Sequence, residues 1–127
     1  MKRSILVDEK IHKVELHRPP VIVRVNKFNE EAAEKFTKQM DAAQNSGQPI
    51  VPIVIDSYGG QVYSLMSMIS NIKAAGLPIA TIIEGKAMSC GAILFSFGHD
   101  GMRYMDKDAT LMIHDVSSMS YGKNEEI

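Results

Sequence analysis

The chain has 127 residues, of which 45% are hydrophobic, so it is long enough for one domain with a real core and too short for two. Its 14 basic and 15 acidic residues are scattered, which argues against a nucleic-acid or membrane partner and favours a protein or peptide. One cysteine cannot form an internal disulfide, and no apolar run approaches the roughly 18 to 20 residues of a membrane span, so we expect a soluble, cytoplasmic protein.

The first 19 residues are expected to form an N-terminal arm or strand. Residues 4 to 17 alternate loosely between apolar and charged types, and Pro19 and Pro20 then close the segment. The predicted domain is residues 20 to 127.

From residue 21 onward, strand and helix patterns alternate. Asn29 is a candidate N-cap, and the apolar segment 50 to 56 is typical of a strand covered on both faces. Strands are predicted at residues 21–25, 50–56, 77–84, 103–105 and 109–116, and helices at residues 30–44, between Gly60 and Gly76, and at 89–98. The apolar faces of the first two helices are Ala33, Phe36, Met40 and Ala43, and Val62, Leu65, Met66, Ile69 and Ile72. This βαβαβα order predicts an α/β fold with a mainly parallel sheet and right-handed helical crossovers.

Ligands of open α/β sheets bind at the carboxyl ends of the strands. Three segments of this chain are predicted to lie there. Gly59 and Gly60 can bring backbone close to a substrate and aim N–H groups outward. Ser89 stands at the start of a helix, where its hydroxyl is exposed above the sheet. His114 interrupts an apolar strand.

Each feature alone has a more ordinary explanation. A glycine pair before a helix is usually a turn, and a serine at a helix start is usually a cap. A histidine in an apolar strand is usually a core residue, and Cys90 alone would be a small buried hydrophobe. The three segments carry weight only together.

In this order, the segments IVIDSYGGQV, GKAMSCGAILFSFG and KDATLMIHDV closely resemble the three signature blocks of the Clp protease proteolytic subunit (ClpP) family of self-compartmentalised serine peptidases. The resemblance covers roughly residues 20 to 127. The 29 positions from Gly60 to Ser89 and the 25 from Ser89 to His114 match the spacing expected of that family. The resemblance implies repeated β-β-α units of the ClpP/crotonase type.

The resemblance also implies roles for individual residues. Ser89 is the nucleophile and His114 the general base that accepts its proton. The N–H groups of Gly60 and Cys90 form the oxyanion hole, while the side chain of Cys90 turns into the domain. The substrate peptide lies as an added strand along Gly59, Gly60, Gln61 and Val62.

The chain departs from the family pattern at several positions. Tyr58 stands where the family usually has proline, and Asp56 where asparagine is common. The family's aspartate that orients the histidine follows a long handle helix, and both are absent from the 13 residues after His114. Asp115 would point to the opposite face of its strand from His114, and the sequence does not place Asp106 or Asp108. On this ground we expect a weak or inactive peptidase.

Three functions stay open. The first is an ATP-independent serine endopeptidase subunit that cleaves unfolded polypeptides, or a shortened viral form of it in the host cytoplasm. The second is a non-catalytic ring or assembly subunit, and the third, ranked last, is a crotonase-like acyl-CoA enzyme, which needs no serine and histidine at this spacing. By resemblance, the partners are further copies in a ring and an AAA+ unfoldase. No cofactor or metal is predicted, because His12, His17 and His99 lack neighbours at ligand spacing and the glycine loop lacks a phosphate-binding lysine.

Overall fold

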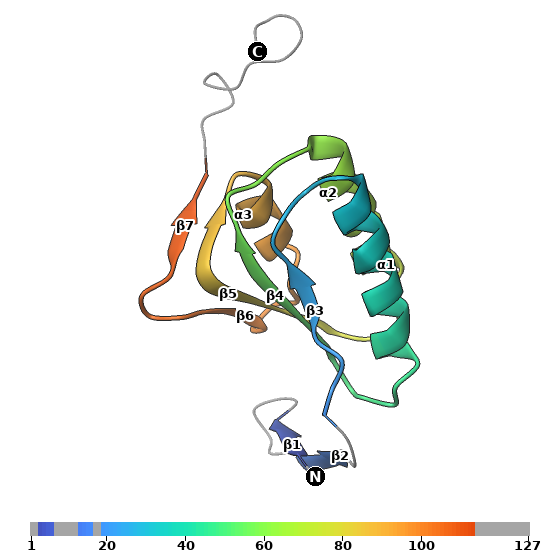
Figure 1. The fold of residues 1–127 in the computed structure, drawn as a ribbon. Helices are drawn as coiled ribbons and strands as arrows, with labels where there is room; N and C mark the ends of the chain where they lie inside the picture. The colour runs from blue at the N-terminus through green and yellow to red at the C-terminus, as the bar shows by residue number, and fades with distance from the viewer. Residues whose placement is uncertain (1–2, 7–12, 17–18, 114–127) are drawn as a thin grey trace, which may run out of the picture.

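A computed structural model describes residues 3–6, 13–16 and 19–113 (Figure 1). Within the N-terminal segment, β1 (Arg3–Leu6) and β2 (Lys13–Leu16) pair antiparallel, with Arg3 opposite Leu16. The sequence suggested one strand or arm here, whereas the backbone forms two short strands. His114 and the end of the strand predicted at 109–116 lie outside the described residues. The division of the chain at residue 19 stays a prediction.

Within residues 19–113, the main sheet contains five strands, all of them parallel to their neighbours. They are β3 (Val23–Val25), β4 (Val51–Ser57), β5 (Ile79–Met88), β6 (Arg103–Met105) and β7 (Thr110–Met112). The order is β3-β4-β5-β6, and β7 also pairs with β5. The predicted α/β fold with a mainly parallel sheet is therefore confirmed.

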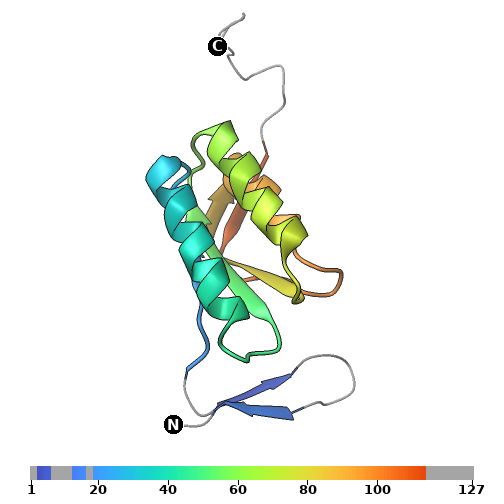
Figure 2. The same cartoon turned by 90° about the vertical axis from the view of Figure 1, so that its right-hand side faces the viewer.

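In this described part of the chain, three helices connect the strands: α1 (Glu30–Gln44), α2 (Val62–Ala74) and α3 (Cys90–Phe95). Figure 2 shows α1 and α2 side by side over one face of the sheet, and α3 packs against β4, β5 and α2. The predicted cap is present, because Asn29 Oδ1 accepts a hydrogen bond from the Ala32 N–H at 2.7 Å. No helix in the described part of the chain combines the length and apolar character that a bilayer crossing demands.

The core lies between the helices and one face of the sheet. Along β4, buried residues alternate with half-buried ones, so the prediction that this strand is covered on both faces is wrong within the described structure. Phe36, Met40 and Ala43 of α1 are buried as predicted. On α2, Leu65 and Ile72 are buried as predicted, and Ile69 is partly buried against the core. The prediction is wrong for Val62 and Met66, which are exposed, and Met68 is buried in their place.

A bulge divides β5 into two halves with different neighbours. Ile55 pairs with Ile83, but Ser57 pairs with Ala87, so β5 carries two extra residues there. Gly85 makes the bend with φ 91°, a conformation that favours glycine. The first half of β5 pairs with β6 and the second half with β7. The strand predicted at 77–84 therefore continues to Met88, through residues that the sequence indicated as a loop.

The third helix is shorter than predicted. It begins at Cys90 and ends at Phe95, whereas the sequence indicated residues 89–98. The N–H groups of Phe97 and Gly98 donate to carbonyls three residues back, which tightens the chain into a turn. Thr81 Oγ1 also donates to the Phe95 carbonyl at 2.8 Å, so a carbonyl at the helix end gains a partner.

Candidate active site

Ser89 lies between the end of β5 and the start of α3 in a strained backbone conformation. With φ 55° and ψ −116°, it is the one non-glycine residue of the described chain with positive φ. Its side chain makes no capping hydrogen bond. The ordinary explanation of a serine at this position, a helix cap, therefore does not apply, and the hydroxyl is left available for chemistry.

The glycine pair that follows β4 lies directly against Ser89. A Cβ atom added to Gly59 would come within 3.0 Å of Ser89 Cβ and 3.1 Å of the Met88 carbonyl oxygen, so only glycine allows this approach. Gly59 also has φ 113°, and its N–H donates to Ser57 Oγ at 3.0 Å. The structure thus brings together the first two of the three predicted segments.

Gly60 and Cys90 also meet at this point. The Cys90 thiol donates to the Gly60 carbonyl at 3.5 Å, which holds the two backbones together. No described residue accepts a hydrogen bond from the Gly60 N–H. Cys90 is the first residue of α3, so its N–H has no acceptor within the helix. Both predicted oxyanion donors are therefore backbone N–H groups with capacity to bind a further acceptor.

The predicted substrate-binding residues differ in conformation. Gln61 is extended, with φ −80° and ψ 130°, and Gly60 makes a parallel bridge to Phe28, whereas Gly59 has φ 113°. Val62 is the first residue of α2, so it cannot continue an extended strand. Gly60 and Gln61 therefore have backbone suited to pairing with a peptide, and the substrate-binding roles of all four residues stay predictions.

The third predicted segment approaches Ser89 through β7. The Ser89 N–H donates to the Met112 carbonyl at 3.0 Å, so the end of β7 is fixed to the nucleophile candidate. His114 follows Met112 by two positions and lies outside the described residues. Its contact with Ser89 stays a prediction.

The chemistry of Cys90 differs from that of Ser89. Burial raises the pKa of the Cys90 thiol above its ordinary value of 9.0, since the charged thiolate is poorly solvated there. The sulfur is buried and donates its proton to a carbonyl, which disfavours a role as nucleophile. No group of three or more metal-ligating side chains occurs among the described residues.

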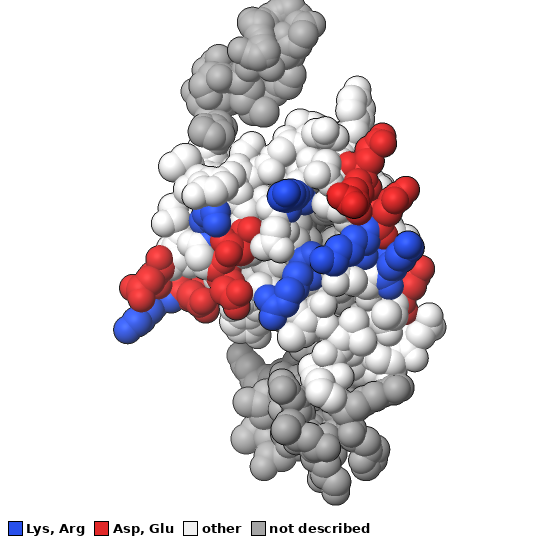
Figure 3. Space-filling view, viewed as in Figure 1, with Lys and Arg blue, Asp and Glu red and all other residues white. Residues whose placement is uncertain are grey.

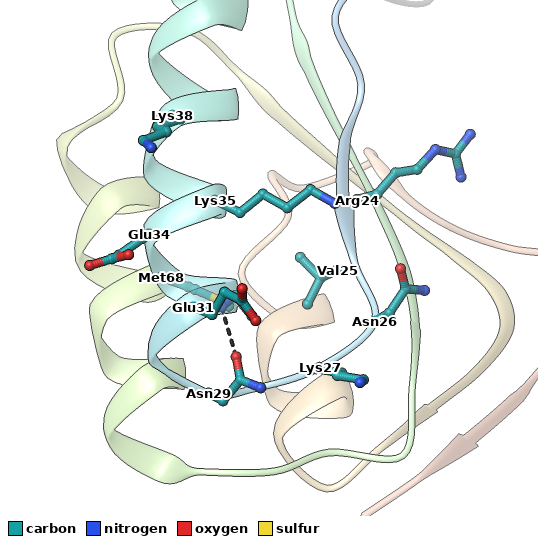
Figure 4. Close-up of a pocket in the computed structure, with 11 residues that line it drawn as sticks. Arg24, Val25, Asn26, Lys27, Asn29, Glu31, Glu34, Lys35, Lys38 and Met68 are labelled. Atoms are coloured by element: carbon teal, nitrogen blue, oxygen red, sulfur yellow. Dashed lines mark hydrogen bonds between the residues drawn. The ribbon is translucent and has the colours of Figure 1, made fainter.

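A cavity of about 590 Å³ lies away from Ser89, between β3 and α1 (Figure 4). Lys35 extends across it toward Arg24, while Glu31 and Glu34 lie one helical turn from lysines. Figure 3 shows the same mixture of positive and negative side chains on this face. Opposite charges at this spacing are typical of a solvated helix face, so we do not assign the active site to this cavity.

Sequence reasoning missed three contributors to the site. These are the Met112 carbonyl and the salt-bridged side chains of Asp56 and Lys86, whose Oδ1 and Nζ atoms lie 2.7 Å apart. Asp56 was noted only as a departure from a pattern. Lys86 gave no signal, because it lies in a segment that the sequence indicated as a loop. The two charges come together because Ile55 pairs with Ile83 and Ser57 pairs with Ala87. This register depends on a bulge that no local sequence motif predicts.

The fold and site define an α/β protein with a parallel sheet and a strained serine beside a glycine pair at the carboxyl ends of its central strands. The family model described as Clp protease matches residues 9–127, and the chain belongs to that family.

Curated relatives carry the same family name. The ATP-dependent Clp protease proteolytic subunit 1 of Chlamydia trachomatis serovar D is 38% identical over 73 residues, which are 58% of this chain and 38% of the relative. The protein of the same name from Salinibacter ruber is 32% identical over 85 residues, or 67% of this chain and 36% of the relative. These matches span little more than a third of the relatives' own length.

Proposed function

We propose that this chain is a serine-type endopeptidase subunit of a Clp-type self-compartmentalised protease, in which Ser89 is the nucleophile and His114 the general base. The observation that carries the proposal is the backbone of Ser89. A non-glycine residue with φ 55°, no capping bond and a glycine pair against it is typical of a nucleophile held in a sharp turn.

The proposed reaction forms an acyl-enzyme. Ser89 Oγ attacks the peptide carbonyl carbon while His114 takes the hydroxyl proton and then gives it to the leaving amine. Water next attacks the ester, His114 accepts its proton and returns it to Ser89 Oγ, and the acid product departs. The N–H groups of Gly60 and Cys90 stabilise the negative oxygen of both tetrahedral intermediates.

Substrate recognition through backbone suits unfolded polypeptides. A peptide pairing with Gly60 and Gln61 would use main-chain hydrogen bonds, which tolerate most side chains. Cleavage itself needs no ATP in this proposal. Assembly into a ring of identical subunits in the cytoplasm, and delivery of unfolded chains by an AAA+ unfoldase, belong to the same proposal and rest on family membership.

A fluorophosphonate probe tests the nucleophile directly, because it labels activated serine hydroxyls. We expect labelling at Ser89, its loss in Ser89→Ala, and labelling near the wild-type rate in Cys90→Ala. His114→Ala should slow labelling strongly, because proton acceptance by the base is lost. An unlabelled but folded chain would favour a non-catalytic ring subunit, and thiol-specific inactivation without serine labelling would indicate a cysteine enzyme.

A further inference from the structure

An ion pair covered by an aromatic ring lies beside the candidate site. Lys86 Nζ is 2.7 Å from Asp56 Oδ1, and the same nitrogen lies 4.5 Å from the centroid of the Tyr58 ring. The Lys86 and Asp56 side chains keep only 27% and 36% of their surface exposed, whereas Tyr58 is 75% exposed. The three residues therefore form a compact cluster with the aromatic ring outermost.

The cluster lies at the bulge where β5 changes its neighbour. A Cβ on Gly85 would come within 2.8 Å of Asp56 Oδ1, so the carboxylate fills the space that glycine leaves. The backbone carbonyl of Asp56 also accepts a hydrogen bond from Asn26 Nδ2 at 3.1 Å. Asp56 is thus fixed both to β3 and to the bend in β5.

The position of the pair relative to the site is the central point. Asp56 precedes Gly59 by three residues, and Lys86 precedes Ser89 by three residues. The ion pair therefore joins the end of β4 to the end of β5 three residues before these two segments contact each other at Gly59 and Ser89. We propose that the Asp56–Lys86 ion pair, covered by Tyr58, is a positioning device that fixes the Gly59–Gly60 loop against Ser89.

This role follows from the strain at the site. Strained backbone persists only where surrounding contacts over-determine it, and Ser89 has φ 55° while Gly59 packs against it. The pair is neutral as a whole, so it adds no net charge to the site and acts through position. The hydrogen bond to Asp56 raises the pKa of Lys86 above its ordinary 10.5, which keeps the Lys86 ammonium charged at neutral pH.

A displacement of about 1 Å in a catalytic group lowers rates by up to about 100-fold. An ion pair that stays partly open to solvent contributes little to global stability. We therefore expect Lys86→Met to lower the maximal rate of fluorophosphonate labelling by about 10- to 100-fold. The probe concentration for half-maximal rate and the thermal midpoint should stay near wild type. Lys86→Arg, which keeps the charge and the hydrogen bond, should recover most of the rate.

Arg24→Met is the matched control. It removes another β5 salt bridge, Arg24 to Glu84 at 3.6 Å, whose two side chains are more than half exposed. This variant should label at the wild-type rate. If Lys86→Met does not fold, the double variant Asp56→Asn with Lys86→Met, which removes the ion pair without leaving an unpaired carboxylate, takes its place against the same control. A wild-type labelling rate in the folded variant at the pair would overturn the positioning role.

The inference rests on the proposed function, so one readout is independent of the nucleophile. Amide hydrogen exchange should accelerate at residues 57–60, 86–89 and 110–112 in Lys86→Met and stay unchanged there in Arg24→Met. If the wild-type chain is not labelled at all, the proposed function fails and the exchange comparison alone decides the positioning role. Equal exchange in the two variants would then refute it.

Discussion

Single residues in strained conformations hold the candidate site. A side chain at a position such as that of Ser89 costs on the order of 1 to 3 kcal/mol, which neighbouring bonds must offset. The Ser89 N–H donates to Met112, and the Ser89 carbonyl accepts from Ala92 and Ile93 at 3.0 and 3.2 Å. The strained serine is thus fixed on both sides of its Cα atom.

Gly59→Ala should inactivate the site as well as destabilise the fold. The new Cβ would meet Ser89 Cβ at 3.0 Å and would also require φ 113°. We expect a loss of about 1 to 3 kcal/mol in the free energy of unfolding and a near-complete loss of Ser89 labelling. Denaturant unfolding and fluorophosphonate labelling measure the two effects.

Gly101→Ala separates strain from the local clash. Gly101 has φ 79°, yet an added Cβ would meet nothing within 4 Å. This variant should lose less free energy of unfolding than Gly59→Ala, because only the backbone cost remains, and it should keep the labelling rate of the wild type. Similar labelling in Gly59→Ala and Gly101→Ala would contradict the close approach of Gly59 to Ser89.

Cys90 should resist thiol reagents in the folded chain. Burial raises its pKa above 9.0, so at pH 8 the native thiol stays mostly protonated, and alkylation by iodoacetamide should be much slower than in urea-unfolded protein. The free energy of unfolding should fall at high pH, because the thiol of the unfolded chain ionises at a lower pH than the buried native thiol. The stabilisation due to the neutral thiol is fully present below pH 9 and is lost as the pH rises through the native pKa. Equal alkylation rates in the two states would show that the thiol is accessible.

Sequence reasoning found the residues whose type carries the chemistry. Gly60, Ser89 and Cys90 occupy a signature pattern, and the structure places them together. Sequence reasoning did not find Lys86 or the Met112 carbonyl, because their roles depend on which strands are neighbours in the sheet. Pairing between residues far apart in sequence leaves no local periodicity, so these contributors emerge only from the folded backbone.

Element types were predictable from sequence, and element ends were less so. The strand predicted at residues 50–56 is observed as β4, from Val51 to Ser57. The end of β5 was missed because Glu84, Gly85 and Lys86 are typical of a loop, while the bulge and β7 make them part of the strand. The apolar face of α2 shifted to include Met68, because α3 and α1 pack against the helix from directions that periodicity alone does not give.

Gln48 joins two elements and was indicated only as part of a turn. Its side chain is buried, accepts from the Val21 N–H at 2.8 Å and donates to the carbonyls of Val21 and Ile50 at 3.0 and 2.9 Å. Gln48→Leu would leave these three backbone groups without partners. We expect a loss of about 2 to 4 kcal/mol in the free energy of unfolding, since each unsatisfied buried group costs about 1 to 3 kcal/mol and part is recovered by water.

Gln39→Leu is the control for that substitution. Gln39 Oε1 accepts one hydrogen bond, from the Arg24 N–H at 3.0 Å, at an exposed position where water can replace it. This variant should lose less than about 1 kcal/mol by chemical denaturation. Similar losses in the two variants would show that Gln48 does not connect the start of the domain to β4.

At the scale of the whole molecule, the edge of the sheet formed by β6 and β7 is exposed and carries several large apolar side chains. Every residue of β6 and β7 is exposed, including Tyr104, Met105, Leu111 and Met112. Exposed edge strands with large apolar side chains tend to associate with other chains unless they are covered. A second copy of the chain is the occupant expected from the proposed ring assembly.

Charges placed on β6 should therefore weaken self-association. We expect the wild-type chain to sediment as an oligomer, and the double variant Tyr104→Glu with Met105→Lys, at side chains 51% and 44% exposed, to sediment mainly as a single chain with an unchanged circular dichroism spectrum. Glu34→Lys with Lys38→Glu, a charge exchange on the solvated face of α1, should leave the oligomer intact, because it keeps the net charge and the spacing of opposite charges. A monomeric wild-type chain, or an oligomer that survives the β6 charges, would mean that copies do not associate through this edge.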